Sequence, residues 1–222
     1  MLDEKLFNEK GYIIIENVLT DKEVSYYKNV CYSDVFSKHL KQEVSGFNFH
    51  LLEILAMEKK LISLAKHPAI VELIKPILGK NIQLQHSKLA TKMPGKNLGN
   101  VAWHQDFAFS PHTNTDLVAV MIALDAINEI NGCMKMLSGS YKRGPLNHND
   151  SMGNIVDKCM DPVWKEEGAV IENVIVPRGG ISIHHCLNLH CSYDNLSDQP
   201  RTAMVFEYRA DDAMQLADGV WK

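Results

Sequence analysis

Two histidines and one aspartate have the types and spacing best suited to bind a metal in this sequence. His104 and Asp106 are separated by one residue, in the segment Trp103-His104-Gln105-Asp106. In an extended strand, residues two apart point to the same side, so this imidazole and this carboxylate can converge. His190 can supply a second imidazole from far along the chain. Two histidines and a carboxylate form a triad that suits iron(II) and leaves coordination positions open.

Arg201 is the second residue that suggests chemistry. It begins an apolar segment, residues 202–206, which is typical of an inward-facing strand. A buried arginine needs a partner, because an unpaired charge in the core is strongly destabilising. A dicarboxylate co-substrate could be held bidentately by the guanidinium group. A protein carboxylate such as Asp194 or Asp198 could pair with Arg201 instead, and both alternatives stay open. The nearby His184 and His185 are expected to be packed core or edge residues.

The segments that must position these residues change character near Gly79. Before this glycine, the sequence predicts a buried strand at 11–19 and a helix after Thr20, where Glu23 completes a capping box. A helical zone is expected at 51–78. After the glycine, short strands are predicted at 82–91, 101–107, 117–124, 134–137, 170–176, 181–185 and 202–209.

This order of elements indicates the fold class. Helices followed by many short strands favour an α+β, mainly β protein, in which a sandwich or barrel is buttressed by N-terminal helices. The dipeptide Asn131-Gly132 predicts a tight hairpin that pairs 134–137 back onto 117–124. We also expect residues 36–64 to cover the mouth of the active site. No repeat or linker interrupts the chain, so we expect a single domain over residues 1–222.

Composition excludes several other classes of protein. With 45% hydrophobic residues, the 222-residue chain can bury a substantial core. Its net charge of -4 provides no basic surface for nucleic acid. No apolar run approaches the roughly 20 residues of a membrane span. Five cysteines in no regular framework, and an N-terminus without a secretory pattern, predict a cytoplasmic protein.

Several motifs, in a fixed order, resemble the phytanoyl-CoA dioxygenase family. They are His104-Gln105-Asp106, Asn131-Gly132-Cys133, Ser138-Gly139-Ser140, His190-x-Ser192 and Arg201, preceded by a family-like first strand at 11–19. The resemblance spans nearly the whole chain. It implies a double-stranded β-helix, which is a jelly roll of the cupin type, with a metal near one mouth.

The resemblance also implies a reaction. In this family, His104, Asp106 and His190 match the ligands of iron(II). The expected enzyme is a non-haem dioxygenase that uses 2-oxoglutarate and dioxygen as co-substrates. It would decarboxylate 2-oxoglutarate to succinate and CO2. A small-molecule substrate, such as a biosynthetic metabolite, would be hydroxylated, desaturated or cyclised.

The co-substrate contacts follow from the same resemblance. Arg201 and Ser192 match the residues that bind the far carboxylate of 2-oxoglutarate. Gln85 falls where the family often has a further co-substrate contact, and Lys92 is a second candidate of this kind. One departure is Cys191, which follows the distal histidine where glycine is common and could narrow the co-substrate pocket.

Two other functions remain open on the sequence alone. The chain could be a catalytically silent binding module of the same fold. It could also be a zinc-dependent hydrolase or isomerase that uses the same ligands, although zinc sites favour closely spaced Cys/His sets. Neither the identity of the substrate nor the oligomeric state follows from the sequence.

Overall fold

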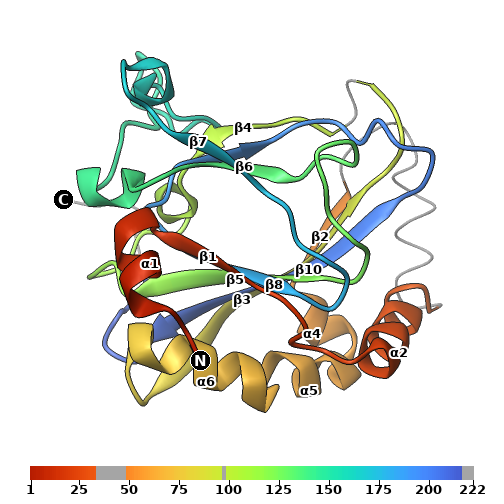
Figure 1. Cartoon of the computed structure of the whole chain (residues 1–222). Helices are drawn as coiled ribbons and strands as arrows, with labels where there is room; N and C mark the ends of the chain where they lie inside the picture. Colours follow the sequence, from red (N-terminus) through yellow and green to blue (C-terminus); the bar gives the residue numbers. More distant parts are fainter. Residues whose placement is uncertain (34–48, 97–98, 217–222) are drawn as a thin grey trace.

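The structure, a computed structural model, describes residues 1–33, 49–96 and 99–216. In this part of the chain, two antiparallel sheets face each other (Figure 1). The major sheet has the order β1 (Tyr12–Ile15), β8 (Ile181–His185), β5 (Leu117–Ala123), β10 (Arg201–Ala210), β3 (Ile82–Lys92), β2 (Phe49–Leu52). The minor sheet has the order β4 (Val101–His104), β9 (His190–Ser192), β6 (Met134–Leu137), β7 (Ile171–Val174). The predicted mainly β architecture is confirmed.

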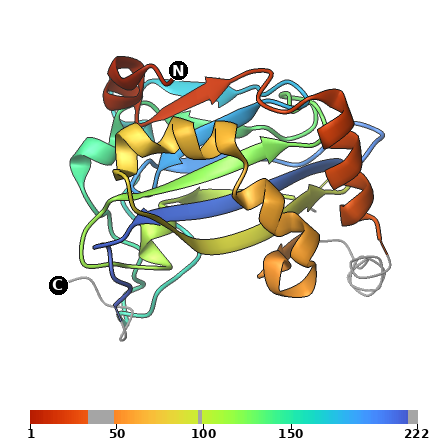
Figure 2. The same ribbon diagram turned by 90° about the horizontal axis from the view of Figure 1, so that it is seen from below.

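Four helices of the described residues lie against the outer face of the major sheet (Figures 1 and 2), namely α2 (Asp21–Cys31), α4 (Ile54–Met57), α5 (Ile62–Ala65) and α6 (Pro68–Leu78). Helix α1 (Glu4–Lys10) lies at the end of this sheet, next to the start of β1. Ile70 and Ile74 of α6 are fully buried in one cluster with Val120 and Phe206 of the sheet. This apolar layer covers the outer face of the major sheet. The inner face of the sheet is turned toward the minor sheet, where the candidate site lies. No helix of the described residues is long and apolar enough to cross a membrane.

The capping box predicted at the start of α2 is confirmed. The Thr20 hydroxyl accepts a hydrogen bond from the backbone N–H of Glu23 at 3.3 Å. In return, the Glu23 carboxylate accepts the backbone N–H of Thr20 at 2.8 Å. Two N–H groups that the helix itself leaves without a partner are thereby satisfied.

We expect Thr20→Ala to lower the stability of the protein slightly. Loss of an N-cap side chain costs about 1 kcal/mol, which corresponds to a fall in Tm of roughly 2–4 °C for a chain of this size. Thermal unfolding followed by circular dichroism measures the shift. Thr20→Ser keeps the hydroxyl and serves as the control. An unchanged Tm in the alanine variant would show that α2 does not depend on this cap.

The space between the sheets is lined by small side chains of the major sheet. The buried alanines in this layer are Ala90, Ala119, Ala123 and Ala203. From the minor sheet, Met136 and Val174 are fully buried in the same cluster. Because alanine side chains are short, they leave room for a site between the sheets.

The predicted hairpin at Asn131-Gly132 is wrong. β6 does not pair with β5 but with β7 and β9 of the minor sheet. The physical reason is that both edges of β5 are already occupied, by β8 on one side and β10 on the other. The Asn131-Gly132 turn, in which Gly132 has a φ of 78°, therefore belongs to a crossing between the sheets.

Two other segments differ from the sequence analysis. Residues 51 and 52, predicted to be helical, belong to β2, because their backbone pairs with β3 at the edge of the major sheet. β9 was not predicted, since three residues are too few to show an alternating pattern. Of the predicted cover at 36–64, residues 36–48 lie outside the described part of the chain.

Candidate active site

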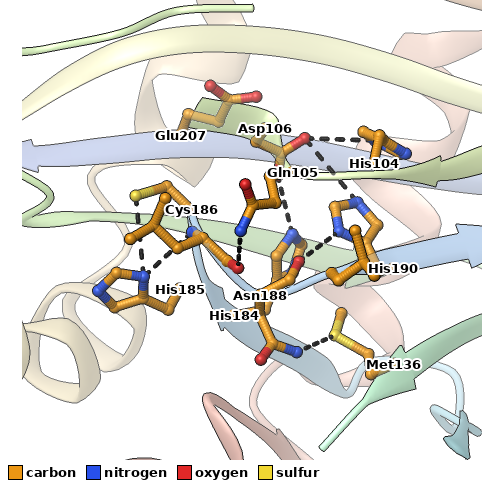
Figure 3. Close-up of polar contacts among 12 residues, drawn as sticks. His104, Gln105, Asp106, Met136, His184, His185, Cys186, Asn188, His190 and Glu207 are labelled. Carbon is orange, nitrogen blue, oxygen red and sulfur yellow. Dashed lines mark hydrogen bonds and ion pairs between the residues drawn. The ribbon is translucent and has the colours of Figure 1, made fainter. Parts of the chain in front are cut away.

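The three predicted metal ligands come together at one end of the space between the sheets (Figure 3). His104 ends β4 and His190 begins β9, and the two residues are paired across the strands. Asp106 follows at the start of a short 3-10 turn, Asp106–Ala108. Its Oδ1 lies 3.6 Å from Nε2 of His104 and 3.8 Å from Nε2 of His190. One ligand atom from each side chain lies within 4.8 Å of the others.

The predicted strand at 101–107 ends at His104, so Asp106 is not part of it. Gln105 nevertheless keeps an extended backbone, with φ −110° and ψ 132°, which leaves Asp106 on the same side as His104. The buried Gln105 side chain donates to the carbonyl of Leu187 at 2.7 Å and bonds twice to the 144–146 loop. The convergence of the two ligands thus depends on a fixed turn as well as on strand geometry.

Backbone carbonyls orient both imidazoles. Nδ1 of His104 donates to the carbonyl of Ala102 at 2.8 Å, and Nδ1 of His190 donates to that of Asn188 at 2.9 Å. In these tautomers, Nε2 carries the lone pair and faces Asp106. Metal-binding histidines commonly use their other ring nitrogen in this way.

A third histidine, His184 of β8, contacts the aspartate from the opposite side. Its Nε2 donates to Oδ2 of Asp106 at 3.0 Å, which leaves Oδ1 toward His104 and His190. His184 is buried, as expected, but it also bonds to a predicted metal ligand, and the sequence analysis missed this contact. The sequence feature that could have revealed this contact is the alternation in β8. Ile181 and Ile183 pack into the outer core, so Ser182 and His184 face the space between the sheets. The neighbouring His185 instead accepts the backbone N–H of Leu187.

The charge states in this cluster suit metal binding. Burial raises the pKa of Asp106, but the nearby His190, His104 and His184 outweigh it and hold that pKa well below its usual value. Burial, followed by repulsion from His104, holds the pKa of His190 well below its usual value. The aspartate is therefore anionic and His190 is neutral at pH 7, the forms in which both side chains bind metals.

We expect His184→Leu to weaken metal binding without removing a ligand. Loss of a side chain that orients a ligand typically costs 10- to 100-fold in metal affinity. Anaerobic titration of the purified protein with iron(II) measures the change. His185→Leu removes the adjacent histidine, which does not contact Asp106, and should leave the affinity for iron(II) within about threefold. Equal affinities in both variants would contradict a positioning role for His184.

A cavity of about 70 Å³ adjoins the three ligands. Its polar lining includes Arg201, Ser192, Lys88, Lys92 and His184, and its apolar lining includes Ala90, Met121 and Val205. Arg201 and Ser192, predicted to hold the co-substrate, therefore share one cavity with the predicted metal ligands. Cys191 also lines it.

Arg201 is buried without a carboxylate partner. It is 3% exposed, and its Nη2 donates to the carbonyl of Gly132 at 2.8 Å. Its Nε has no hydrogen-bond partner, and no ion pair joins it to a carboxylate within residues 1–33, 49–96 and 99–216. Burial lowers the pKa of Arg201 to about 10, so the guanidinium stays charged at pH 7. A buried cation with a free donor fits an anionic ligand that enters the cavity.

Lys92 lies beside Arg201, directly across the β3–β10 pair. It is also 3% exposed, and its ammonium donates to the backbone carbonyls of Gly99 and Tyr193. Burial and the neighbouring Arg201 lower the pKa of Lys92 to about 7. At pH 7 Arg201 is therefore fully charged at this end of the cavity, and Lys92 beside it is only partly charged.

Gln85 is not brought to the cavity. Its side chain accepts from Nε of Arg209 at 3.1 Å and donates to Gln215 at 2.9 Å. The register of β3 against β10 shifts between Glu207 and Tyr208, and Gln85 is the residue left without a partner there. Lys88 and Lys92 of the same strand face the cavity, and regular alternation from them would place Gln85 on the opposite face of the sheet. The bulge leaves Gln85 beside Arg209, at the end of the β3–β10 pair away from Arg201.

The donor set fits the metal and co-substrate that the motifs implied. Two imidazole nitrogens and one carboxylate on one side suit iron(II) and leave the side toward the cavity open. At the other end, the free donor of Arg201 fits a carboxylate. No cysteine belongs to the ligand group among the described residues, which disfavours a closed zinc site.

Comparison with known families identifies the chain. The family model described as phytanoyl-CoA dioxygenase (PhyH) matches residues 7–203. The chain belongs to this family, and the assignment made from the motifs is confirmed.

Two curated relatives of the chain are named as dioxygenases. The chain is 37% identical over 157 residues to a probable alpha-ketoglutarate-dependent hypophosphite dioxygenase of Stutzerimonas stutzeri, over 69% of this chain and 54% of that protein. It therefore spans about half the length of this relative. It is 24% identical to the peroxisomal phytanoyl-CoA dioxygenase of Homo sapiens, over 94% of this chain and 68% of that protein.

Solved structures share the fold. The non-haem α-ketoglutarate-dependent carbocyclase SnoK from nogalamycin biosynthesis matches with a TM-score of 0.79 and 23% identity, over 96% of this chain and 85% of that one. EctD from S. alaskensis, with 2-oxoglutarate and 5-hydroxyectoine, matches with a TM-score of 0.76 and 17% identity, over 95% and 76%. The predicted double-stranded β-helix is confirmed.

Proposed function

We propose that this protein is an iron(II)- and 2-oxoglutarate-dependent oxygenase that oxidises a small molecule. The observation that carries the proposal is the shared cavity, in which a His-Asp-His group faces a buried arginine without a carboxylate partner. His104, Asp106 and His190 would hold the metal. Arg201 and Ser192 would bind the far carboxylate of 2-oxoglutarate. The family and the named relatives support this assignment.

The residues of the chain supply orientation and charge. When bound, iron(II) would provide the site at which dioxygen and 2-oxoglutarate are converted to succinate, CO2 and an oxidised product. The backbone bonds to His104 and His190 hold both rings in place, and His184 holds Asp106. A guanidinium group can hold a carboxylate with two parallel hydrogen bonds. Arg201 would therefore fix the orientation of 2-oxoglutarate in the cavity.

Spectroscopy and product analysis test the proposal. Iron(II) and 2-oxoglutarate, added without oxygen, should give a weak visible charge-transfer band, and admitting oxygen should then produce succinate. Tight zinc binding without that band would favour a zinc hydrolase or isomerase. A normal band without succinate, for every substrate tried, would favour a silent binding module.

We further propose that residues 1–222 form one domain and that the substrate is a small molecule, such as a biosynthetic metabolite. The relatives named for hypophosphite and for 2-aminoethylphosphonate make compact phosphorus compounds the first to test. A cytoplasmic location is proposed because all five cysteines are free and buried. Reducing compartments are where unpaired thiols persist.

A further inference from the structure

Lys88 presents to the cavity an ammonium group that donates no hydrogen bond to a described residue, beside the three metal-binding candidates. It extends from β3 and lines the cavity together with His104, Asp106 and His190. Its side chain is 21% exposed, and its only ionic contact among the described residues is with Glu207, at 3.8 Å. This distance is too long for a hydrogen bond. No other described group accepts a hydrogen bond from Lys88, so its three N–H donors are available.

Lys88 is separate from Arg201 and Ser192, which are proposed to hold 2-oxoglutarate. It lies four residues before Lys92 on the same strand, and it faces Val205 where Lys92 faces Arg201. At the rise of an antiparallel strand, four residues correspond to about 13 Å between Cα atoms. The two ends of the cavity therefore present positive charge at different positions, with Asp106 close to the Lys88 end.

Lys88 has carboxylates near it but no hydrogen-bond acceptor among the described residues. Glu207 belongs to the neighbouring strand β10 and lies near Asp106 (Figure 3). The two carboxylates line one small hollow. A close ion pair between Lys88 and Glu207 would neutralise the lysine. At 3.8 Å the Glu207 carboxylate orients the ammonium group but accepts no hydrogen bond from it. Holding a partly buried cation without hydrogen bonds is costly. A ligand that carries an anionic oxygen would supply the missing acceptors.

We propose that Lys88 binds a compact oxyanion of the substrate, namely a carboxylate, a phosphonate or a phosphorus oxyacid, and that Glu207 positions the lysine. This inference rests on the proposed oxygenase function. Because Lys88 and the metal-binding candidates line one cavity, an oxyanion bound there lies next to the reacting centre. The bond that is oxidised then lies within a few atoms of the charged group. The substrate class is therefore a small anion or zwitterion and not a long acyl chain.

Binding measurements on the complex with iron(II) and 2-oxoglutarate, kept free of oxygen, test the proposal. Sodium hypophosphite, 2-aminoethylphosphonate and L-proline are titrated separately by calorimetry. We expect at least one of them to bind the native protein. We expect Lys88→Met to weaken this binding at least tenfold and Lys88→Arg to retain most of it. The affinity for 2-oxoglutarate, read from the charge-transfer band, should change less than twofold in both variants.

Lys135→Met is the matched control, because Lys135 is also a strand lysine but lies in the minor sheet away from the cavity. It removes the same charge and should leave anion binding unchanged. Thermal unfolding verifies that each variant is folded, and Lys88→Arg keeps the test valid should the methionine variant unfold.

Three results would overturn the proposal. They are no binding of any of the three anions by the native complex, equal binding by Lys88→Met, or weakened binding of 2-oxoglutarate in place of the anion. The last result would mean that Lys88 contacts 2-oxoglutarate itself, at the end of the molecule that would bind the metal. Failure of the oxygenase function is a different result, since the native protein would then show no charge-transfer band at all.

Discussion

Asp106→Ala is expected to abolish iron(II) binding at this site and, with it, all succinate formation. Asp106 is the one anionic member of the group, and its Oδ1 faces the Nε2 atoms of both His104 and His190. Removing a residue that only orients a ligand costs 10- to 100-fold in affinity, so loss of a ligand itself should exceed about 100-fold. Anaerobic iron(II) titration and succinate analysis measure the two effects.

Asp157→Ala is a suitable control, because Asp157 is an exposed aspartate outside the site. It should bind iron(II) and form succinate as the native protein does. Asp106→Asn keeps the size of the side chain but removes its charge, and it should lose most of the affinity as well. Succinate formation at the native rate by Asp106→Ala would show that the metal is held elsewhere.

Arg201→Met is expected to raise the KM for 2-oxoglutarate steeply while iron(II) stays bound. Truncating one partner of a buried charge pair costs about 2–5 kcal/mol, and each 1.4 kcal/mol is tenfold, so a loss of roughly 30-fold or more is expected. Methionine fills much of the arginine's volume. Since Nε of Arg201 has no partner among the described residues, the substitution should cost little stability. The charge-transfer band gives the affinity for 2-oxoglutarate.

Arg178→Met serves as the control for Arg201. The guanidinium of Arg178 bonds the carbonyl of Leu124 and the hydroxyl of Ser25, outside the cavity. Its loss should leave the KM for 2-oxoglutarate unchanged. An unchanged KM in Arg201→Met would instead mean that Arg201 serves the structure through its bond to Gly132.

Patterns confined to a few neighbouring residues could be read without the fold. The capping box at Thr20 and the buried strand at 117–124 are such cases, since a cap hydrogen bond and a continuous apolar run both involve only neighbouring residues. The spacing of His104 and Asp106 could be read in the same way. The family resemblance added the roles of His190 as the distal metal ligand and of Arg201 as a co-substrate contact, because ordered motifs carry long-range information that no single segment contains.

Pairings between distant segments required the folded chain. β6 pairs with β9 because both edges of β5 are already occupied by β8 and β10. The sequence of a turn does not contain this information. Gln85 is held by Arg209 and Gln215 at the end of the β3–β10 pair away from Arg201, and these long-range contacts cannot be read from the local sequence.

The polar network around the predicted ligands depends in the same way on the approach of separate strands. His184 meets Asp106 only because β8 lies in the sheet opposite β4. Lys88 remains without a close partner because Glu207 stops 3.8 Å away on the next strand. Residue types and short spacings thus specify which groups can react. Burial, register and the distances between strands specify which of them meet and which remain available to a ligand, since these quantities are set by the packing of the whole chain.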